Sequence, residues 1–143
     1  MHDTRAPELS FEVSGLPPIR TDGLSVLSAG HRQAVRVRAL LTAACDAAQR
    51  TGWTAVTGPV ALDIVLSCPP GHRTVDAAQL IGGIGTVLQD KKRVGTTGLA
   101  HLGVLLDVAL YVDERQIRRL TYQENPAEEM SYLVRVAAVP VTV

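Results

Sequence analysis

The spacing of hydrophobic residues changes along this chain, and these changes most constrain its fold. In residues 29–50 the apolar side chains recur every three or four positions, which is the spacing of one face of a helix. In residues 60–67 strongly apolar positions alternate with weaker ones, a period of two that is typical of a β-strand. A second helical stripe follows in residues 77–89. The order predicts helices and strands that share one core.

Short polar residues stand where both helical stripes begin. Ser28 and Asp76 each precede a stripe, and their side chains can accept a hydrogen bond from a free N–H of the first helical turn. The second stripe contains Gly82, Gly83 and Gly85, each of which costs about 1 kcal/mol relative to Ala inside a helix. We therefore expect another part of the chain to pack closely against the backbone of this helix.

The remaining segments predict strands and loops around these helices. Phe11 and Val13 alternate with polar residues, which predicts a short strand that ends at residues 15–18, where two prolines remove ladder donors. The later segments complete the order: a mobile loop at 90–98, a third strand or a short helix running into one at 104–112, a strand at 116–124, a turn at 125–129 and a final strand at 132–139.

These elements predict an α+β fold: a single domain with a mixed β-sheet of four to five strands and two helices packed on one face. A length of 143 residues suits one domain, because two domains would each have too small a core. Residues 1–10 mix charges with Pro7 and lack periodicity, so we expect a disordered leader there and a folded domain over 11–143.

Charge and hydropathy narrow the class of protein. The chain has 14 Lys and Arg residues against 14 Asp and Glu residues, so a site that depends on charge must be a local patch. No uncharged run approaches the roughly 18 residues that span a bilayer, and we expect a cytoplasmic protein with no signal peptide and no membrane partner. Cys45 and Cys68 are not in a CxxC motif, so we expect buried thiols.

Several familiar catalytic motifs are missing from the sequence. Residues 82–85 are rich in glycine, but neither GxGxxG nor GxxxxGK[ST] is present and the glycines lie inside a helical stripe. This argues against a nucleotide cofactor. The chain also has no GxSxG and no HExxH, so a serine or cysteine triad has no support.

Carboxylates are the remaining candidates for chemistry. Asp76 follows the strand at 60–67 and its loop, while Asp113 and Glu114 follow the apolar run at 104–112. If that run lies beside the strand at 60–67, the three acids meet at one edge of the sheet, where hard oxygen ligands suit Mg²⁺. The alternative is that Asp76 only caps a helix and that Asp113 and Glu114 form a charged turn.

Basic residues gather in the first half of the first helical stripe. His31, Arg32, Arg36 and Arg38 are followed by no acid until Asp46. This helix face either contacts phosphates or is an ordinary solvated surface.

In their order, several segments resemble the RusA family of Holliday junction resolvases, and the resemblance runs from Phe11 to Val136. The segments that carry it are Leu16-Pro17-Pro18 with Arg20, Leu27-Ser28-Ala29 before the basic helix, Cys68-Pro69-Pro70, Arg73-Thr74-Val75-Asp76 and Asp113-Glu114-Arg115-Gln116-Ile117. The resemblance implies a homodimer with a mixed sheet that binds branched DNA, namely four-way junctions, and cuts phosphodiesters.

The resemblance also implies a site. Asp76, Asp113 and Glu114 would be the catalytic residues that hold Mg²⁺, or Mn²⁺, whose bound water attacks in line. The residues that would contact DNA are Arg20, Arg32, Arg36, Arg38, Arg73, Lys91 and Lys92.

Two positions depart from the family pattern Asp-x-Asp-Asn-x-x-Lys. Ala78 stands at the second Asp and Gly82 at the Lys, and Lys91, Lys92 or Arg93 would have to replace the missing cation.

One hypothesis is a Mg²⁺-dependent endodeoxyribonuclease of recombination and repair, which the run from Asp113 to Ile117 favours. The other is a catalytically impaired module that binds DNA or protein, which Ala78 and Gly82 favour. A small dimeric domain with no role on nucleic acid is a third reading.

Overall fold

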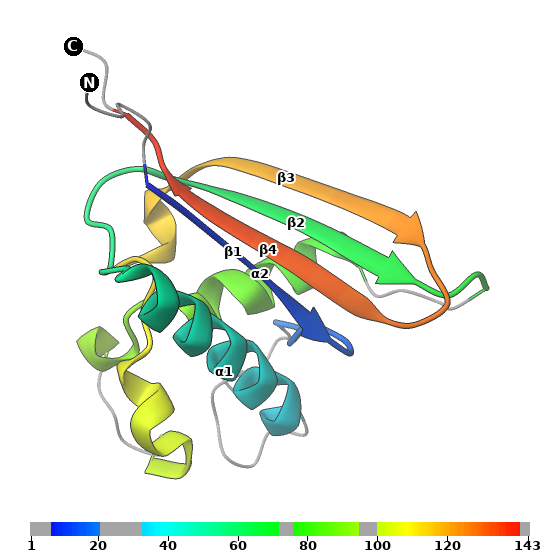
Figure 1. The fold of residues 1–143 in the computed structure, drawn as a ribbon, viewed down its shortest axis with the longest axis horizontal. Coiled ribbons are helices and arrows are strands. Elements are labelled where there is room, and N and C mark those ends of the chain that lie inside the picture. The colour runs from blue at the N-terminus through cyan, green and yellow to red at the C-terminus, as the bar shows by residue number, and fades with distance from the viewer. Residues whose placement is uncertain (1–6, 21–32, 72–75, 95–99, 141–143) are drawn as a thin grey trace.

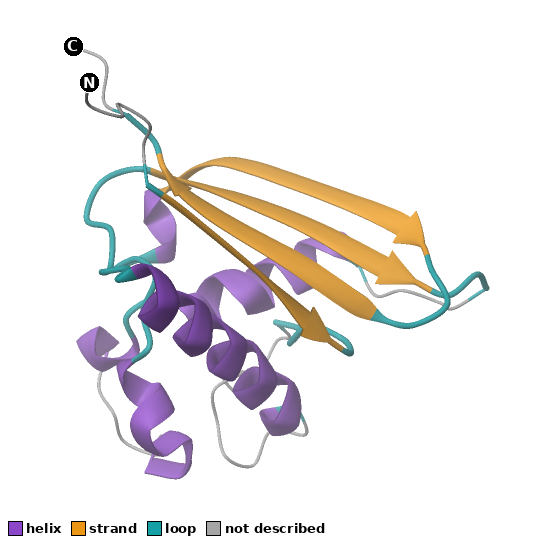
Figure 2. Cartoon of the chain, viewed as in Figure 1, coloured by secondary structure: helices purple, strands orange, loops and turns teal. Residues whose placement is uncertain are grey.

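The computed structural model describes residues 7–20, 33–71, 76–94 and 100–140. Its elements are the strands β1 (Glu8–Ser14), β2 (Val60–Cys68), β3 (Ile117–Pro126) and β4 (Ser131–Ala138), the α-helices α1 (Ala34–Thr51) and α2 (Ala77–Leu88), and the 3₁₀ helices η1 (Lys91–Val94), η2 (Ala100–Asp107) and η3 (Glu114–Gln116). Both α-helices lie on one side of the sheet (Figure 2). The predicted α+β fold is confirmed.

The sheet has four strands in the order β1-β4-β2-β3 (Figure 1). β4 pairs antiparallel with both β1 and β2, whereas β3 pairs parallel with β2. At the centre of the sheet Ile64 lies between Val134 on β4 and Tyr122 on β3. The single parallel pair makes the sheet mixed, and it leaves β1 and β3 as the two edge strands.

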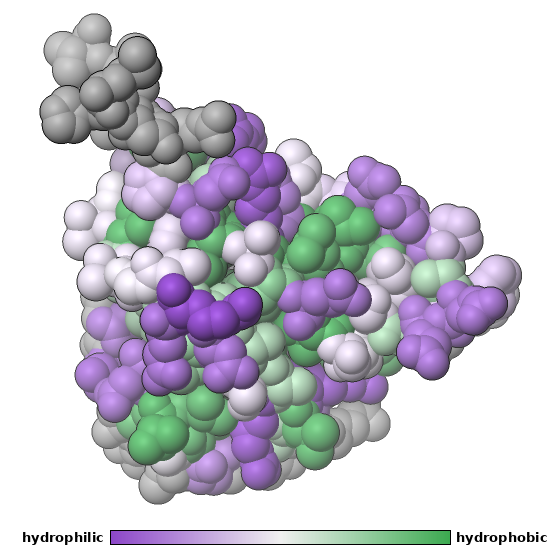
Figure 3. Space-filling view, in the orientation of Figure 1, coloured by the Kyte–Doolittle hydropathy of each residue, from purple (hydrophilic) through white to green (hydrophobic). Residues whose placement is uncertain are grey.

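The core lies between the helices and three of the four strands. Alternate residues of β1, β2 and β4 are buried beneath the helices, and β3 has no buried residue. α1 contributes the apolar stripe that its spacing predicted, namely Val37, Leu40, Leu41, Ala44 and Ala47. The other face of the sheet is mostly polar, although Leu133 on β4 is 40% exposed there and apolar surface is visible over the strands in Figure 3.

α2 begins as predicted and packs as its glycines predicted. The Asp76 side chain accepts a hydrogen bond from the Ala78 N–H at 2.9 Å and so caps the helix. An ideal Cβ added to Gly83 would lie 2.5 Å from the carbonyl carbon of Pro18 and closer still to its oxygen. Only a glycine lets the chain at Pro18 approach the helix this closely.

Residues 104–112 are not a strand of the sheet. They contain the end of η2 and then an extended stretch in which Tyr111 forms isolated bridges with Val56 and Gln89. The indole N–H of Trp53 donates to the carbonyl of Leu110 at 3.0 Å. This segment therefore packs beside α1 and the end of α2, and the sheet neighbours of β2 are β3 and β4.

Several predicted boundaries need correction. β1 begins at Glu8 and Leu9 is buried, so residues 8–10 belong to the folded domain and not to a leader. α1 begins at Ala34, and Ser28 lies outside the described residues. Residues 125 and 126 belong to β3 instead of a turn, because they continue its pairing with β2. Residues 91–94 form η1 where a mobile loop was expected.

No helix in the described ranges is long and apolar enough to cross a membrane.

Candidate functional site

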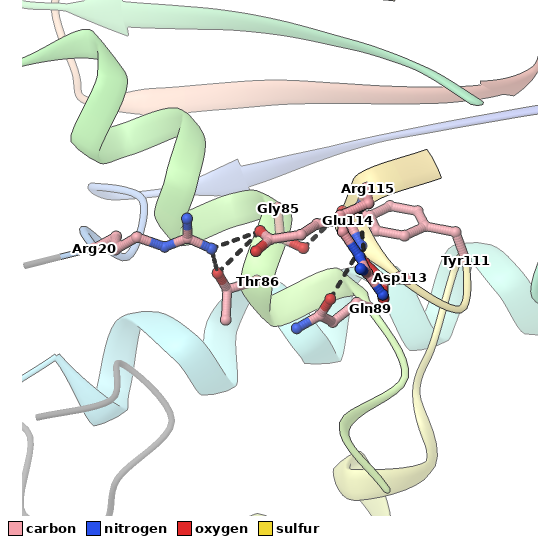
Figure 4. A network of polar contacts seen from close by, with 8 residues as sticks. All are labelled: Arg20, Gly85, Thr86, Gln89, Tyr111, Asp113, Glu114 and Arg115. Atoms are coloured by element: carbon pink, nitrogen blue, oxygen red, sulfur yellow. Dashed lines mark hydrogen bonds and ion pairs between the residues drawn. The ribbon is translucent and has the colours of Figure 1, made fainter. Parts of the chain in front are cut away.

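A network of polar contacts lies against the second half of α2 (Figure 4). Arg20 extends along the helix, and its guanidinium donates to the Glu114 carboxylate at 2.5 Å and also to the Thr86 hydroxyl. Thr86 in turn donates to the same Glu114 oxygen at 3.2 Å. Glu114 is thus held by a cation and a hydroxyl, both of which lie on one side of its carboxylate.

Hydrogen bonds hold the backbone around Arg20 to α2 and to Gln33 at the start of α1. The Arg20 N–H donates to the Gln79 carbonyl on α2 at 2.9 Å. Gln33, which precedes α1, bonds both backbone groups of Ile19, and its amide N–H to the Ile19 carbonyl measures 2.9 Å. A Cβ at Gly82 would lie 3.2 Å from the Arg20 side chain, so the glycine leaves room for that side chain to lie across the helix.

η3 places Asp113 and Glu114 by a local capping box. The Asp113 side chain accepts from the Arg115 N–H at 2.8 Å, while the Asp113 N–H donates to the Gln116 side chain at 2.7 Å. The Gln116 amide also donates to the carbonyls of Val56 at 2.8 Å and Gly58 at 2.7 Å. Gln116 thereby ties η3 to the segment before β2.

Asp113 and Glu114 point to different partners. Asp113 forms an ion pair of 2.9 Å with the exposed Arg115, whereas Glu114 faces α2. The Glu114 N–H donates to the Gln89 side chain at 3.0 Å, and the buried Tyr111 hydroxyl donates to the Gly85 carbonyl at 2.7 Å. Burial and the charge of Glu114 raise the pKa of Tyr111, so this hydroxyl stays protonated as a donor.

Asp76 lies at the other end of α2 from Glu114. It precedes Thr86 by ten residues, which corresponds to about 15 Å along a helix axis. Mg²⁺ binds its oxygen ligands at about 2.1 Å, so the three carboxylates do not fit a single ion as they are placed here. Within the described residues, no group of three or more His, Cys, Asp or Glu side chains is arranged to hold a metal. The expected meeting of Asp76 with Asp113 and Glu114 at one sheet edge is therefore wrong, because residues 104–112 do not lie beside β2.

Lys91 closes the end of α2 and is 1% exposed. Its ammonium donates to the carbonyls of Val87 at 2.8 Å and Gln89 at 3.0 Å, and also to that of Val108. Burial lowers the pKa of Lys91 to about 8. The prediction that Lys91 contacts DNA is wrong, since a buried ammonium cannot reach a phosphate. The sequence did not indicate that Lys91 is buried, because it adjoins Lys92 and Arg93, and adjacent cations usually form a solvated surface.

The other predicted cations are dispersed. Lys92 is exposed and pairs with Asp107 at 3.0 Å. On α1, Arg36 and Arg38 stand on either side of the buried Val37, and Arg38 is the more exposed of the two. Arg32 and Arg73, which the resemblance implied as DNA contacts, lie outside the described residues.

The structure adds polar residues that the sequence did not single out. Thr86 completes the contacts of Glu114, although no motif marks it. An open hollow of about 950 Å³ lies beside η3, lined by Thr57, Val112, Asp113, Arg115, Gln116 and Arg118. Its arginines belong to the run Arg115-Gln116-Ile117-Arg118-Arg119, whose three cations in five residues were a signal available in the sequence.

No protein-family model matches the chain, and no curated protein matches it.

Proposed function

We propose that this chain is a RusA-like domain that binds branched DNA without cutting it. The observation that carries the proposal is the contact of Arg20 with Glu114 across Gly82. The family pattern has a lysine where Gly82 stands and a carboxylate where Ala78 stands. Here a guanidinium from outside the helix occupies the space above Gly82 and neutralises Glu114, the acid that faces α2.

The run from Asp113 to Ile117 has structural roles that do not require catalysis. Asp113 and Gln116 form the capping box, Gln116 ties η3 to Val56 and Gly58, and Ile117 is the first residue of β3. Removing either polar side chain would leave backbone groups without a partner. The presence of this run is therefore compatible with a domain that lacks the nuclease activity.

The basic start of α1 supports a role in binding phosphates. Arg36 and Arg38 lie in the first two turns, and the helix carries no acid until Asp46. Guanidinium groups bind phosphate oxygens through paired N–H donors. The resemblance to the RusA family points to branched DNA as the ligand of this surface.

The test combines binding and cleavage on the same labelled DNA. A four-way junction and a linear duplex are titrated with the full chain at several salt concentrations, and cleavage is followed with Mg²⁺ or Mn²⁺. We expect tighter binding to the junction, an affinity that falls as salt increases, and no metal-dependent product. Replacing Arg36 or Arg38 by Ala should reduce the slope of log affinity against log salt by about 1 for each lost phosphate contact.

Arg135→Ala is the matched control, because Arg135 is an exposed cation on the sheet face away from the helices, paired with Glu8. It should leave the slope unchanged. Absence of binding even at low salt would overturn the DNA-binding proposal. Metal-dependent cleavage that Asp76→Asn abolishes would overturn the non-catalytic part and favour the endodeoxyribonuclease.

A further inference from the structure

β3 has an open backbone edge over most of its length (Figure 1). In the described part of the chain it pairs only with β2, and none of its ten residues is buried. A bulge interrupts the pairing at Arg118, which has no partner on β2, but residues 119–125 follow in an unbroken register and contain no proline. The outward N–H and C=O groups of this run can therefore pair with one more strand.

The side of β3 that faces the helix layer is also uncovered. Leu62 and Ile64 on β2 are buried under the helices, but their neighbours on β3, Leu120 and Tyr122, are not. Leu120 is 44% exposed. The core ends one strand before the edge of the sheet, so apolar side chains of an added strand would have these two residues as neighbours.

The charge of β3 changes sign along its length. Arg118 and Arg119 stand at its start, where Arg115 and Arg118 line the hollow of about 950 Å³. Glu124 stands near its end, and the turn at 127–130 adds two acids. All of these charged side chains are exposed. The two ends of β3 therefore attract opposite charges.

This arrangement suits a peptide better than DNA. A duplex laid along β3 would bring its phosphates against Glu124 and the acids of the turn, because every phosphate is negative. An extended peptide can carry charges of both signs, and its main chain can pair with the open edge. Peptides that add a strand to a sheet gain affinity from these main-chain hydrogen bonds and specificity from alternate side chains.

We propose that β3 binds an extended segment of another protein as an added antiparallel strand, and that this segment ends in acidic residues. Antiparallel pairing is the more stable kind. In this direction the segment begins with a basic residue opposite Glu124 and continues with apolar residues opposite Tyr122 and Leu120. Its acidic end then lies opposite Arg119 and in the hollow. Peptide binding goes beyond the proposed function, since it requires no DNA.

The test uses the full chain without DNA and a fluorescent synthetic peptide, Lys-Thr-Val-Thr-Val-Asp-Glu-Asp, whose first aspartate would face Arg119. Fluorescence anisotropy should show saturable binding. Arg119→Glu should weaken the binding about tenfold in Kd, because an attractive cross-strand pair becomes a repulsive one. Arg135→Glu is the matched control: it makes the same change of charge on β4, which β2 separates from β3, and should leave the Kd unchanged.

A charge swap separates pairing at Arg119 from damage to the fold. A second peptide carries lysines in place of its three acidic residues, and it should bind Arg119→Glu more tightly than it binds the wild type. Circular dichroism of each variant, expected to match the wild type, checks that all samples are folded.

N-methylated peptides test whether the backbone edge of β3 takes part. One peptide is methylated on every second backbone nitrogen, and another on the intervening ones. Alternate N–H groups of an added strand point toward β3 and away from it. One of the two peptides should therefore bind at least about tenfold more weakly than the other. Equal affinities would exclude pairing at the edge and overturn the proposal.

Absence of saturable binding at about 1 mM peptide would also overturn it. So would a Kd that neither Arg119→Glu nor the charge swap changes, since the peptide would then bind elsewhere. Binding that weakens as the concentration of the chain increases would mean that a second copy covers β3, and it would overturn the proposal as well. Failure of the chain to bind junction DNA would leave these results unchanged, so the two proposals are tested separately.

Discussion

The two ends of α2 differ in what holds them. At the N-terminal end Asp76 is exposed, and its carboxylate caps the first turn through the Ala78 N–H. In the second half, Gly83 packs on Pro18, Thr86 meets Glu114, and Lys91 closes the last carbonyls. The contacts that join α2 to other parts of the chain are therefore concentrated away from Asp76, the acid that a motif search would select. The predictions below compare the two ends, beginning with the largest effect.

Gly83→Ala should be the most damaging substitution in α2. The new methyl group would overlap the Pro18 carbonyl, so the backbone has to move and we expect a loss of about 3 kcal/mol in the free energy of unfolding. Urea denaturation measures the loss. Gly82→Ala is the matched control, because its methyl group meets only the flexible Arg20 side chain and gains about 1 kcal/mol in helix propensity. Equal losses in both variants would contradict this account.

Lys91→Met should cost about 2 kcal/mol, because three carbonyls lose their donor. Burial lowers the pKa of Lys91 from 10.5 to about 8, so between these values the unfolded chain binds more protons than the folded one. The contribution of Lys91 to stability therefore increases as the pH rises from 8 to 10.5. Urea denaturation across this range should show the difference between wild type and variant growing. A constant difference would show that the pKa is not lowered.

At the exposed end, Asp76→Ala should remove only the cap and cost about 1 kcal/mol. Asp76→Asn retains an acceptor of similar quality and should change the unfolding free energy little. Thermal unfolding of the two variants makes the comparison. If Asn proved as harmful as Ala, the charge of Asp76 would matter beyond its hydrogen bond to Ala78.

The ion pair of Arg20 with Glu114 should give the smallest effect. The two side chains are 47% and 32% exposed, so we expect a coupling of about 0.5 kcal/mol in a double-mutant cycle with Arg20→Met and Glu114→Gln. The more exposed pair of Lys92 with Asp107 serves as the control and should couple less. A coupling no larger than that of the control would mean that the network adds little to the fold.

Local spacing predicted the elements of this fold well. The stripe that contains Leu40 and Leu41 is α1, the alternation at 60–67 is β2, and Asp76 caps α2 as its position indicated. These features depend on neighbours in sequence, where helical and strand periods leave a clear pattern.

The candidate site was harder to predict because it depends on contacts between distant segments. Arg20 and Glu114 are 94 residues apart, and no local pattern places one beside the other. The expected meeting of acids assumed that residues 104–112 lie beside β2, but that segment contains the end of η2, which packs against α1, and then a stretch that bonds to Trp53 and to the end of α2. The burial of Lys91 was missed for a similar reason, because one of the carbonyls that its ammonium contacts belongs to Val108, 17 residues further along the chain.

The hydrogen bond between Trp53 and Leu110 makes the indole a fluorescent reporter of the contact between these two segments. Trp53 is the chain's one tryptophan, and Leu110 also donates its N–H to the Leu88 carbonyl at the end of α2. Separation of this segment would release the indole hydrogen bond and expose the ring to water. Its emission spectrum therefore reports, without any label, whether the segment remains docked while α1 and the sheet stay folded.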